Sequence, residues 1–199
     1  MTDILDDQAL ACALQQGDRA AWAALYDQYS VLVWRYVARL IGSDPAAVAD
    51  AVQETFLAAA GSARGFDPSR GTVWAWLTGI AHHKVSAHWR KTGQDRRLVE
   101  RAASNGHAES ADGPGQPPPA ASLEAQETVD VVRRTLAQLP EDYAVLLSAK
   151  YIDDLSVAQL VDRHGGTAEA LRSRLARARR AFREQYERMS RDPRDEVPA

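Results

Sequence analysis

Arginines between residues 168 and 183 have a spacing that suits DNA binding. Leu171, Leu175 and Ala178 recur at helical intervals, which predicts a helix with one buried apolar face. The arginines fall between these positions and must mostly face outward. A guanidinium group can bind a phosphate, or the edge of a guanine in the major groove. Base contacts are expected from Arg172, Ser173 and Arg177, and phosphate contacts from Arg179, Arg180 and Arg183.

A capped short helix and a glycine turn come just before this basic helix. Ser156 and Gln159 form the sequence pattern of a capping box, which predicts a helix over 157–164. Gly165-Gly166 predicts a turn, and Thr167 can cap the next helix. This is helix-turn-helix spacing. The alternative is an ordinary helical hairpin with solvated arginines, but the coincidence of cap, turn, apolar face and basic face favours DNA binding.

Aromatic and basic residues are mixed between residues 64 and 91, a combination that can hold unpaired bases. The composition of 63–71 predicts a loop with Phe66 between Arg64 and Arg70, and a helix is predicted over 73–91. Unpaired bases stack on aromatic rings, each for about 1–3 kcal/mol, while cations hold the backbone. The residues alone leave open a purely structural alternative, in which the core contains Trp74, Trp76 and Trp89.

A third set of side chains, between residues 50 and 57, could dock a protein partner. Asp50, Gln53, Glu54 and Leu57 are spaced i, i+3, i+4 and i+7, so they share one face of a predicted helix. The neighbouring face is apolar and is expected to be buried. Taken by themselves, these residues fit a solvated helix face better than a docking surface.

The histidines do not predict a metal site or an enzyme. His82 and His83 are adjacent on a predicted helix and point apart, and no acidic residue stands four positions on. The sequence contains no nucleophile–base signature, phosphate-binding loop or zinc-protease motif. We therefore expect no cofactor, no metal and no catalytic residue.

Helical periodicity predicts an all-α fold with two small domains. In the first domain, residues 1–91, Asp18 and Asp44 can cap the helices that follow them, and Gly42 ends the helix between them. Residues 92–121 contain a run rich in proline and glycine and predict a flexible linker. Residues 122–189 predict a second domain that contains the helix-turn-helix, with Tyr151 in its core, and 190–199 predict a disordered tail.

Composition indicates a soluble protein and excludes several other classes. The chain has 199 residues, of which 45% are hydrophobic and 26% charged. No apolar run approaches the roughly 20 residues of a membrane span. The acidic N-terminus does not resemble a secretory signal, and Cys12 is the only cysteine, which suits the cytoplasm. The net charge of −3 hides basic blocks at 84–101 and 172–183.

These motifs together resemble the extracytoplasmic-function (ECF) sigma factors of bacterial RNA polymerase. In the first domain the likeness rests on Gly17-Asp18, on Asp50–Leu57 and on Trp76–Ala81, which are similar to sigma region 2. In the second it rests on Leu139-Pro-Glu141, Leu155-Ser156 and Ser173–Arg179, which are similar to region 4. The resemblance covers nearly everything outside the linker and the termini.

The resemblance implies specific partners for each surface. Region 2 would dock on the clamp helices of the polymerase β′ subunit through Asp50, Gln53, Glu54 and Leu57. Region 4 would lie on the β flap and recognise the −35 element of promoter DNA with helix 168–180, through Arg172, Ser173, Arg177, Arg179 and Arg180. Many relatives are inhibited by an anti-sigma factor. The single-stranded −10 element would be bound by Arg64, Phe66, Arg70, His82, His83, Lys84 and Arg90.

Two segments depart from the family pattern. Relatives often have Ala-Arg-Asn, with an Asp four residues later, where this chain has Ala81-His-His83 and Ala87. Before the glycine turn, His164 stands in place of a usual leucine and Gly166 in place of an apolar residue. A buried His164 would cost stability unless it is hydrogen-bonded. The first departure predicts unusual promoter opening or −10 preference. The second predicts either divergent −35 specificity or a less rigid region 4.

A second function remains open on the sequence. A free-standing helix-turn-helix regulator would bind duplex DNA as a dimer, with the N-terminal domain as sensor or dimerisation unit. Such a regulator has no need for the face that contains Asp50, Gln53 and Glu54.

Overall fold

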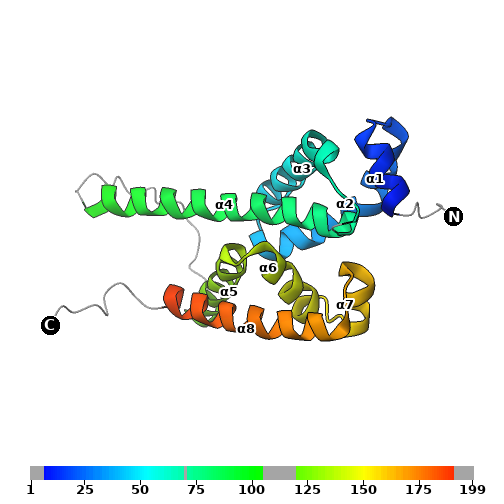
Figure 1. Cartoon of the computed structure of the whole chain (residues 1–199). Coiled ribbons are helices and arrows are strands. Elements are labelled where there is room, and N and C mark those ends of the chain that lie inside the picture. The colour runs from blue at the N-terminus through cyan, green and yellow to red at the C-terminus, as the bar shows by residue number, and fades with distance from the viewer. Residues whose placement is uncertain (1–6, 70, 105–119, 191–199) are drawn as a thin grey trace.

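The computed structural model describes residues 7–69, 71–104 and 120–190, which form helices and turns without a β-strand. The helices fall into two groups with α4 between them (Figure 1). One group contains α1 to α3, and the other contains α5 to α8. The all-α, two-domain fold predicted from the sequence is confirmed.

The first domain is built from helices with well-defined caps. It contains α1 (Asp7–Gln15), α2 (Arg19–Ile41), α3 (Pro45–Ser62), a 3₁₀ turn (Ala63–Gly65) and the first part of α4 (Val73–Ser104). The Asp18 carboxylate accepts a bond from the Ala20 N–H at 2.8 Å, and Asp44 accepts from Ala46 and Ala47 at 3.0 and 3.1 Å. These caps satisfy backbone donors that would otherwise lack partners, so each helix begins where its sequence predicts.

The second domain carries the predicted helix-turn-helix. It contains α5 (Ala120–Gln138), α6 (Glu141–Leu147), a π-helical turn (Ser148–Ile152), α7 (Val157–His164) and α8 (Ala168–Ser190). The capping box is present, because the Ser156 hydroxyl accepts from the Gln159 N–H while the Gln159 side chain accepts from the Ser156 N–H. Gly165 and Gly166 turn the chain with φ angles of +74° and +88°, a region that favours glycine.

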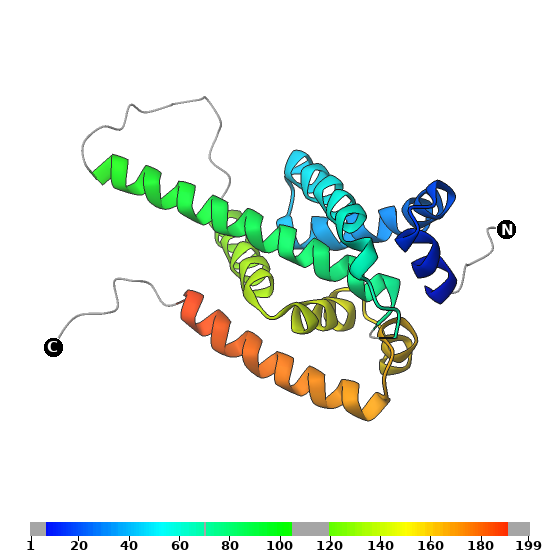
Figure 2. The ribbon, with the colours of Figure 1, turned by 45° about the horizontal axis from the view of Figure 1, so that its top comes forward.

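Helix α4 is longer than its sequence predicts. It was expected to end at Lys91, but it continues to Ser104 and projects beyond the rest of its domain (Figure 2). Residues 92–104 are polar, which suggested a linker, yet they contain no proline and mostly good helix formers. Helix α5 likewise begins at Ala120 rather than at residue 122. The rest of the predicted linker, 105–119, and the tail from 191 lie outside the described residues.

The two domains share one continuous hydrophobic core. Leu25, Val37 and Leu77 of the first domain and Leu160 and Leu171 of the second are fully buried in it. Helix α4 contacts α2 and α3 on one side and α5, α6 and α7 on the other. The domains therefore pack directly against each other through α4.

Among the described helices, none combines the length and the apolar composition that crossing a membrane requires.

Substitution of Leu77 by alanine is expected to destabilise the fold by about 2–5 kcal/mol, because it removes a fully buried side chain and leaves a cavity. Leu98 provides a matched control on the same helix, since it is 61% exposed. Its replacement by alanine should change stability by no more than about 0.5 kcal/mol. Urea denaturation measures both, and equal losses would contradict the assigned core.

Candidate functional site

The predicted docking residues of α3 lie together on one exposed surface. Asp50, Gln53 and Glu54 are exposed, and Leu57 is 64% exposed although it is apolar. The opposite face is held by buried residues such as Val48 and Ala59. The surface thus combines a carboxylate–amide cluster with an uncovered leucine.

Two residues at or beside this surface, Glu54 and Phe56, contact neighbouring helices. The Glu54 carboxylate lies 3.2 Å from the Lys84 ammonium of α4. The half-buried Phe56 ring lies 5.0 Å from the ring of Tyr26 on α2. Because Phe56 touches α2, it anchors α3 to the domain and leaves the neighbouring Leu57 outside.

The structure buries Phe66, which the sequence placed in a DNA-reading loop. Its ring is 8% exposed and stacks on Trp76 at a centroid distance of 4.8 Å. The Gln15 side-chain amide donates to the Phe66 carbonyl at 2.6 Å, which ties the loop to α1. In this arrangement Phe66 therefore cannot stack on a base. Arg64 is exposed, and Arg70 lies outside the described residues.

His82, another predicted DNA contact, is also buried in this structure. It is 2% exposed; its Nε2 lies 3.0 Å from the Leu139 carbonyl oxygen and its Nδ1 lies 3.4 Å from the Tyr36 hydroxyl. A neutral imidazole with the proton on Nε2 donates to Leu139 and accepts from Tyr36. Burial lowers the pKa of His82, which agrees with the neutral form. His82 thus joins the two domains in this structure.

The other predicted −10 residues of α4 remain accessible. His83 and Arg90 are exposed, and Lys84 is partly exposed. The His83 ring lies 3.4 Å from the Glu141 carboxylate of α6. Burial raises the pKa of Glu141, although His83 acts in the opposite direction.

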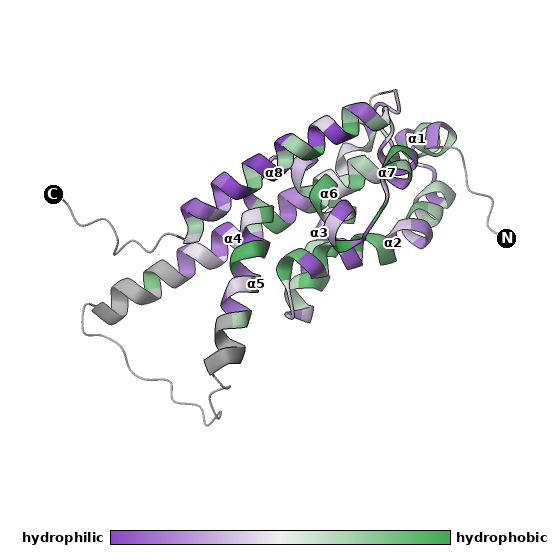
Figure 3. Cartoon of the chain, turned by 90° about the horizontal axis from the view of Figure 1, so that it is seen from below, coloured by the Kyte–Doolittle hydropathy of each residue, from purple (hydrophilic) through white to green (hydrophobic). Residues whose placement is uncertain are grey.

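The predicted −35 residues lie together on the outer face of α8. Leu171, Leu175 and Ala178 are buried, and the arginines between them are exposed. The hydrophilic outer surface of α8 is visible in Figure 3. The exposed set is Arg172, Ser173, Arg177, Arg179 and Arg180.

Two of these side chains already have partners within the domain. Arg179 donates to the Tyr151 hydroxyl at 3.1 Å, and Arg180 lies 3.9 Å from Glu184. Both pairs are exposed, so solvent screens them and they add little stability. The guanidinium groups can therefore exchange these partners for phosphates.

Two family models match this chain, one in each of its two domains. The Sigma-70 region 2 family model matches residues 25–95, and the Sigma-70, region 4 model matches residues 130–182. The ECF RNA polymerase sigma factor SigK of Mycolicibacterium vanbaalenii is 30% identical over 180 residues, which cover 88% of this chain and 86% of that protein. The chain belongs to the ECF sigma factors.

A second sequence relative agrees with this assignment. The ECF RNA polymerase sigma-E factor of Escherichia coli (strain K12) is 31% identical over 191 residues, 92% of this sigma factor and 95% of that protein. The solved structure of CnrH in complex with the cytosolic domain of CnrY is 25% identical, covers 92% of this chain and 97% of that chain, and has a TM-score of 0.45. The sigma factor directs transcription, and the free-standing regulator is not favoured.

The two departures in region 4 of this sigma factor have different consequences. Gly166 is exposed, and a Cβ atom added there would meet no other atom within 4 Å. Gly166 thus belongs to a turn with a positive φ, and an apolar side chain at this position would not be buried in the core. The His164 Nε2 atom, in contrast, is buried without a hydrogen-bond partner among the described residues. Burial, with smaller effects of Arg163 and Arg174, lowers the pKa of His164 to about 4.

An apolar groove on region 4 was not predicted from the sequence. Tyr151 was expected in the core but is 57% exposed. With Ile152 and Phe182 it lines an open groove of about 440 Å³. The π-helical turn at 148–152 carries Tyr151 and Ile152 outward, a local irregularity that periodicity does not reveal. Arg179 and Arg183 line the groove beside these apolar side chains.

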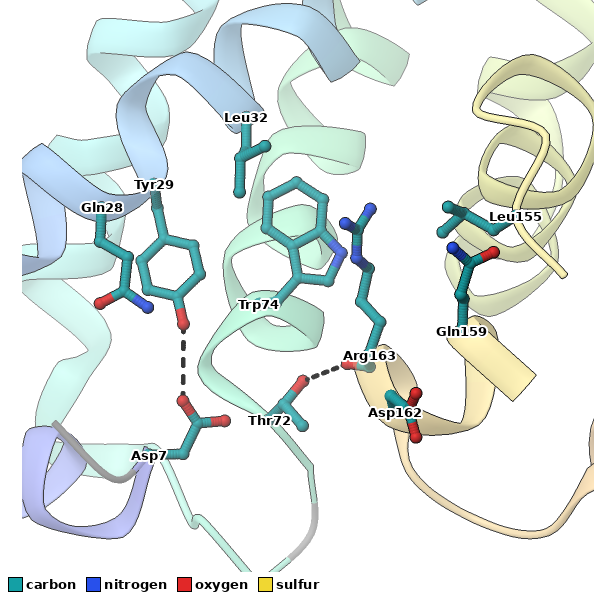
Figure 4. A pocket seen from close by; sticks show the side chains of 10 residues that line it. All are labelled: Asp7, Gln28, Tyr29, Leu32, Thr72, Trp74, Leu155, Gln159, Asp162 and Arg163. Carbon is teal, nitrogen blue, oxygen red and sulfur yellow. Dashed lines mark hydrogen bonds between the residues drawn. The ribbon is translucent and has the colours of Figure 1, made fainter. Parts of the chain in front are cut away.

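A second cavity, of about 620 Å³, lies between the two domains (Figure 4). Asp7 bonds the Tyr29 hydroxyl at 3.5 Å and the Val73 N–H at 3.1 Å. Burial and Asp7 raise the pKa of Tyr29 to about 12. On the other side, the Arg163 guanidinium lies 5.8 Å from the ring centre of Trp74. These contacts give Asp7, Tyr29 and Arg163 partners within the protein.

The described part of the chain has no group of three His, Cys, Asp or Glu side chains close enough to hold a metal ion.

The stability of this sigma factor should fall as the pH drops from about 6.5 to about 4, partly because of His164. Its pKa is depressed in the folded state, so unfolding lets the imidazole take up a proton below its ordinary pKa. Replacement of His164 by leucine removes this effect. The variant should therefore gain more stability over the wild type at pH 5 than at pH 7.5, as measured by urea denaturation.

Comparing the wild type with the His164→Leu variant separates the effect of His164 from the effects of the other buried titratable groups. His82 also has a depressed pKa, and Glu141 has a raised pKa that acts in the opposite direction, but both are present in wild type and variant alike. An equal stability difference at both pH values would show that His164 is not buried in its neutral form.

Proposed function

We propose that this sigma factor docks on the RNA polymerase core through the α3 surface and recognises promoter DNA with α4 and α8. The observation that carries the proposal is that the acid–amide face of α3 and the arginine face of α8 are both exposed in one chain. The first face suits a protein partner and the second suits a polyanion. A free-standing DNA-binding regulator has use for the second face alone.

The partner of the α3 surface is proposed to be the clamp helices of the β′ subunit. Leu57 offers an exposed apolar contact, and Asp50, Gln53 and Glu54 lie on the preceding turns of the same helix face with acceptors and one amide. The face therefore offers a partner both an apolar contact and hydrogen-bond partners. Basic residues on the partner would complement the two carboxylates.

The DNA contacts are proposed to divide between single and double strands. Arg172, Ser173 and Arg177 would meet base edges of the −35 element in the major groove, with Arg179 and Arg180 on phosphates. The single-stranded −10 element would lie along α4 and the preceding loop. Its contacts would come from Arg64, Arg70, His83, Lys84 and Arg90, with Phe66 and His82 available only after rearrangement.

The apolar groove on region 4 is proposed as a second protein-binding surface. Tyr151, Ile152 and Phe182 would receive apolar side chains of a helix from the polymerase β flap, and Arg179 and Arg183 would pair with its acidic residues. An anti-sigma factor is a further proposed partner, and it could compete for the same groove. The protein is proposed to act in the cytoplasm and to catalyse no covalent step.

The double substitution Gln53→Ala/Glu54→Ala should weaken binding to RNA polymerase core by about tenfold or more, equivalent to about 1.4 kcal/mol. The measurement is a pull-down of purified core enzyme followed by run-off transcription. Gln126→Ala/Glu127→Ala is a matched control, because it removes an adjacent amide and carboxylate from another exposed helix face.

Two outcomes of this experiment have distinct meanings. If the wild type neither binds core nor starts transcription, the proposed function is wrong. If the wild type succeeds and the double variant binds equally well, the α3 surface is not the docking site.

Replacement of Arg177 by alanine should reduce promoter-specific transcription and relax the preference for one base pair in the −35 element, at a cost of about 1–3 kcal/mol. Arg180→Ala should instead weaken binding to all sequences similarly, because phosphates carry no base identity. Run-off transcription from a library of −35 sequences separates these effects. Arg188→Ala, an exposed arginine further along α8, serves as control.

A further inference from the structure

The outward face of α8 has a row of side chains along its centre. The buried face of the helix is defined by apolar side chains at helical spacing, namely Leu171, Leu175 and Ala178. With about 3.6 residues per turn, the positions directly opposite to them follow intervals of four, three and four residues. The side chains of this row are all exposed, and they are Glu169, Ser173, Ala176 and Arg180. When α8 enters a DNA groove, this row faces the bases most directly.

Glu169 stands at the N-terminal end of this row, in the first turn of α8. The backbone of this turn is well held, because the Thr167 hydroxyl accepts from the Ala170 N–H at 3.2 Å and the Thr167 carbonyl accepts from the Leu171 N–H at 3.0 Å. In helix-turn-helix proteins, the N-terminal residues of the second helix contact base edges. Glu169 is therefore placed where base pairs are read.

The Glu169 carboxylate is free to accept a hydrogen bond from a ligand. Within the described part of the chain it forms no ion pair, whereas Glu184 on the same helix lies 3.9 Å from Arg180. A carboxylate on a face that binds DNA repels phosphates, because both groups are negatively charged. Its favourable partner on DNA is therefore a hydrogen-bond donor on a base.

The major groove offers few such donors. Cytosine presents its N4 amino group there, and adenine presents its N6 amino group beside the N7 acceptor. Guanine presents only acceptors, and thymine presents an acceptor and a methyl group. The N7 lone pair of adenine repels a carboxylate that approaches the N6 amino group, so cytosine is the base that a carboxylate favours.

We infer that Glu169 determines part of the promoter specificity, and that its carboxylate accepts a hydrogen bond from the N4 amino group of a cytosine in the −35 element. The inference rests on the proposed role of α8 in binding that element. Arg172 and Ser173 follow at three and four positions on the same face, so they would contact adjoining base pairs. The exposed Arg179 and Arg180, further along α8, supply the phosphate attraction that offsets the repulsion by Glu169.

A purely structural role for Glu169 has a different consequence. A carboxylate in the first turn of a helix is stabilised by the helix dipole, whether or not DNA is bound. Removal of its charge would then lower the stability of the protein and leave the preference for each base unchanged. A change in base preference at one position requires a contact between this side chain and DNA.

Base preference is measured with holoenzyme assembled from the full-length sigma factor and purified polymerase core. The template is a promoter library randomised across both elements, and each transcript carries a barcode that identifies its promoter. The wild type should favour cytosine at one −35 position by about tenfold, a typical effect of one mismatched base pair. Glu169→Ala should reduce this preference to about twofold or less and leave the other positions unchanged, because the alanine methyl group cannot accept a hydrogen bond.

Two further variants make the measurement specific. Glu169→Gln keeps the size of the side chain and replaces the carboxylate by an amide, which can bind N6 and N7 of adenine together. This variant should therefore transcribe more from promoters with adenine at that position, relative to cytosine, by about tenfold. Glu187→Ala is the matched control, because it removes an exposed carboxylate near the end of the same helix, and it should leave every preference unchanged.

The possible results separate this inference from the proposed function. Unchanged preferences in Glu169→Ala, or an equal rise in transcription from all promoters, would overturn the inference and leave the proposed function intact. A Glu169→Gln variant with the wild-type preference would contradict the selection of cytosine by a carboxylate. A wild type that starts no transcription, or that has no −35 preference at any position, would contradict the proposed function itself and the inference with it.

Discussion

The end of α5 is the constraint on which the arrangement of this sigma factor depends. Pro140 cannot donate a backbone hydrogen bond, and its ring prevents the helix from continuing. The carbonyls of Ala137 and Leu139 therefore need donors from elsewhere, because a buried unpaired carbonyl costs about 1–3 kcal/mol. Ser86 and His82 of α4 provide those donors. Side chains of the first domain thus supply the hydrogen bonds that these backbone carbonyls of the second domain need.

This dependence sets which surfaces face solvent. Helix α4 lies between the domains, so its inner face is covered, while α3 and α8 keep their outer faces free (Figures 1 and 3). The surface proposed for the polymerase and the surface proposed for duplex DNA are open together. Of the proposed single-strand contacts on α4, His82 is covered, while His83 and Arg90 stay exposed.

Local features of the sequence were sufficient to predict most helices but not the covered face of α4. Caps at Asp18, Asp44 and Ser156 involve residues within three positions, and their bonds occur as predicted. The burial of His82 depends on Leu139, 57 residues away, and no periodicity in α4 carries that information. The exposure of Tyr151 likewise depends on a π-helical turn. Long-range contacts and backbone irregularities are what sequence patterns leave undetermined.

The departure of residues 81–83 from the family pattern acquires a physical meaning here. The resemblance to the family implies an arginine at the position of His82, and a guanidinium is always charged. Such a charge would be buried between Tyr36 and the Leu139 carbonyl, and its loss of hydration would oppose that placement. A neutral imidazole has one donor and one acceptor, which these two groups satisfy. Histidine at position 82 therefore suits the covered position between Tyr36 and the Leu139 carbonyl better than a permanently charged side chain would.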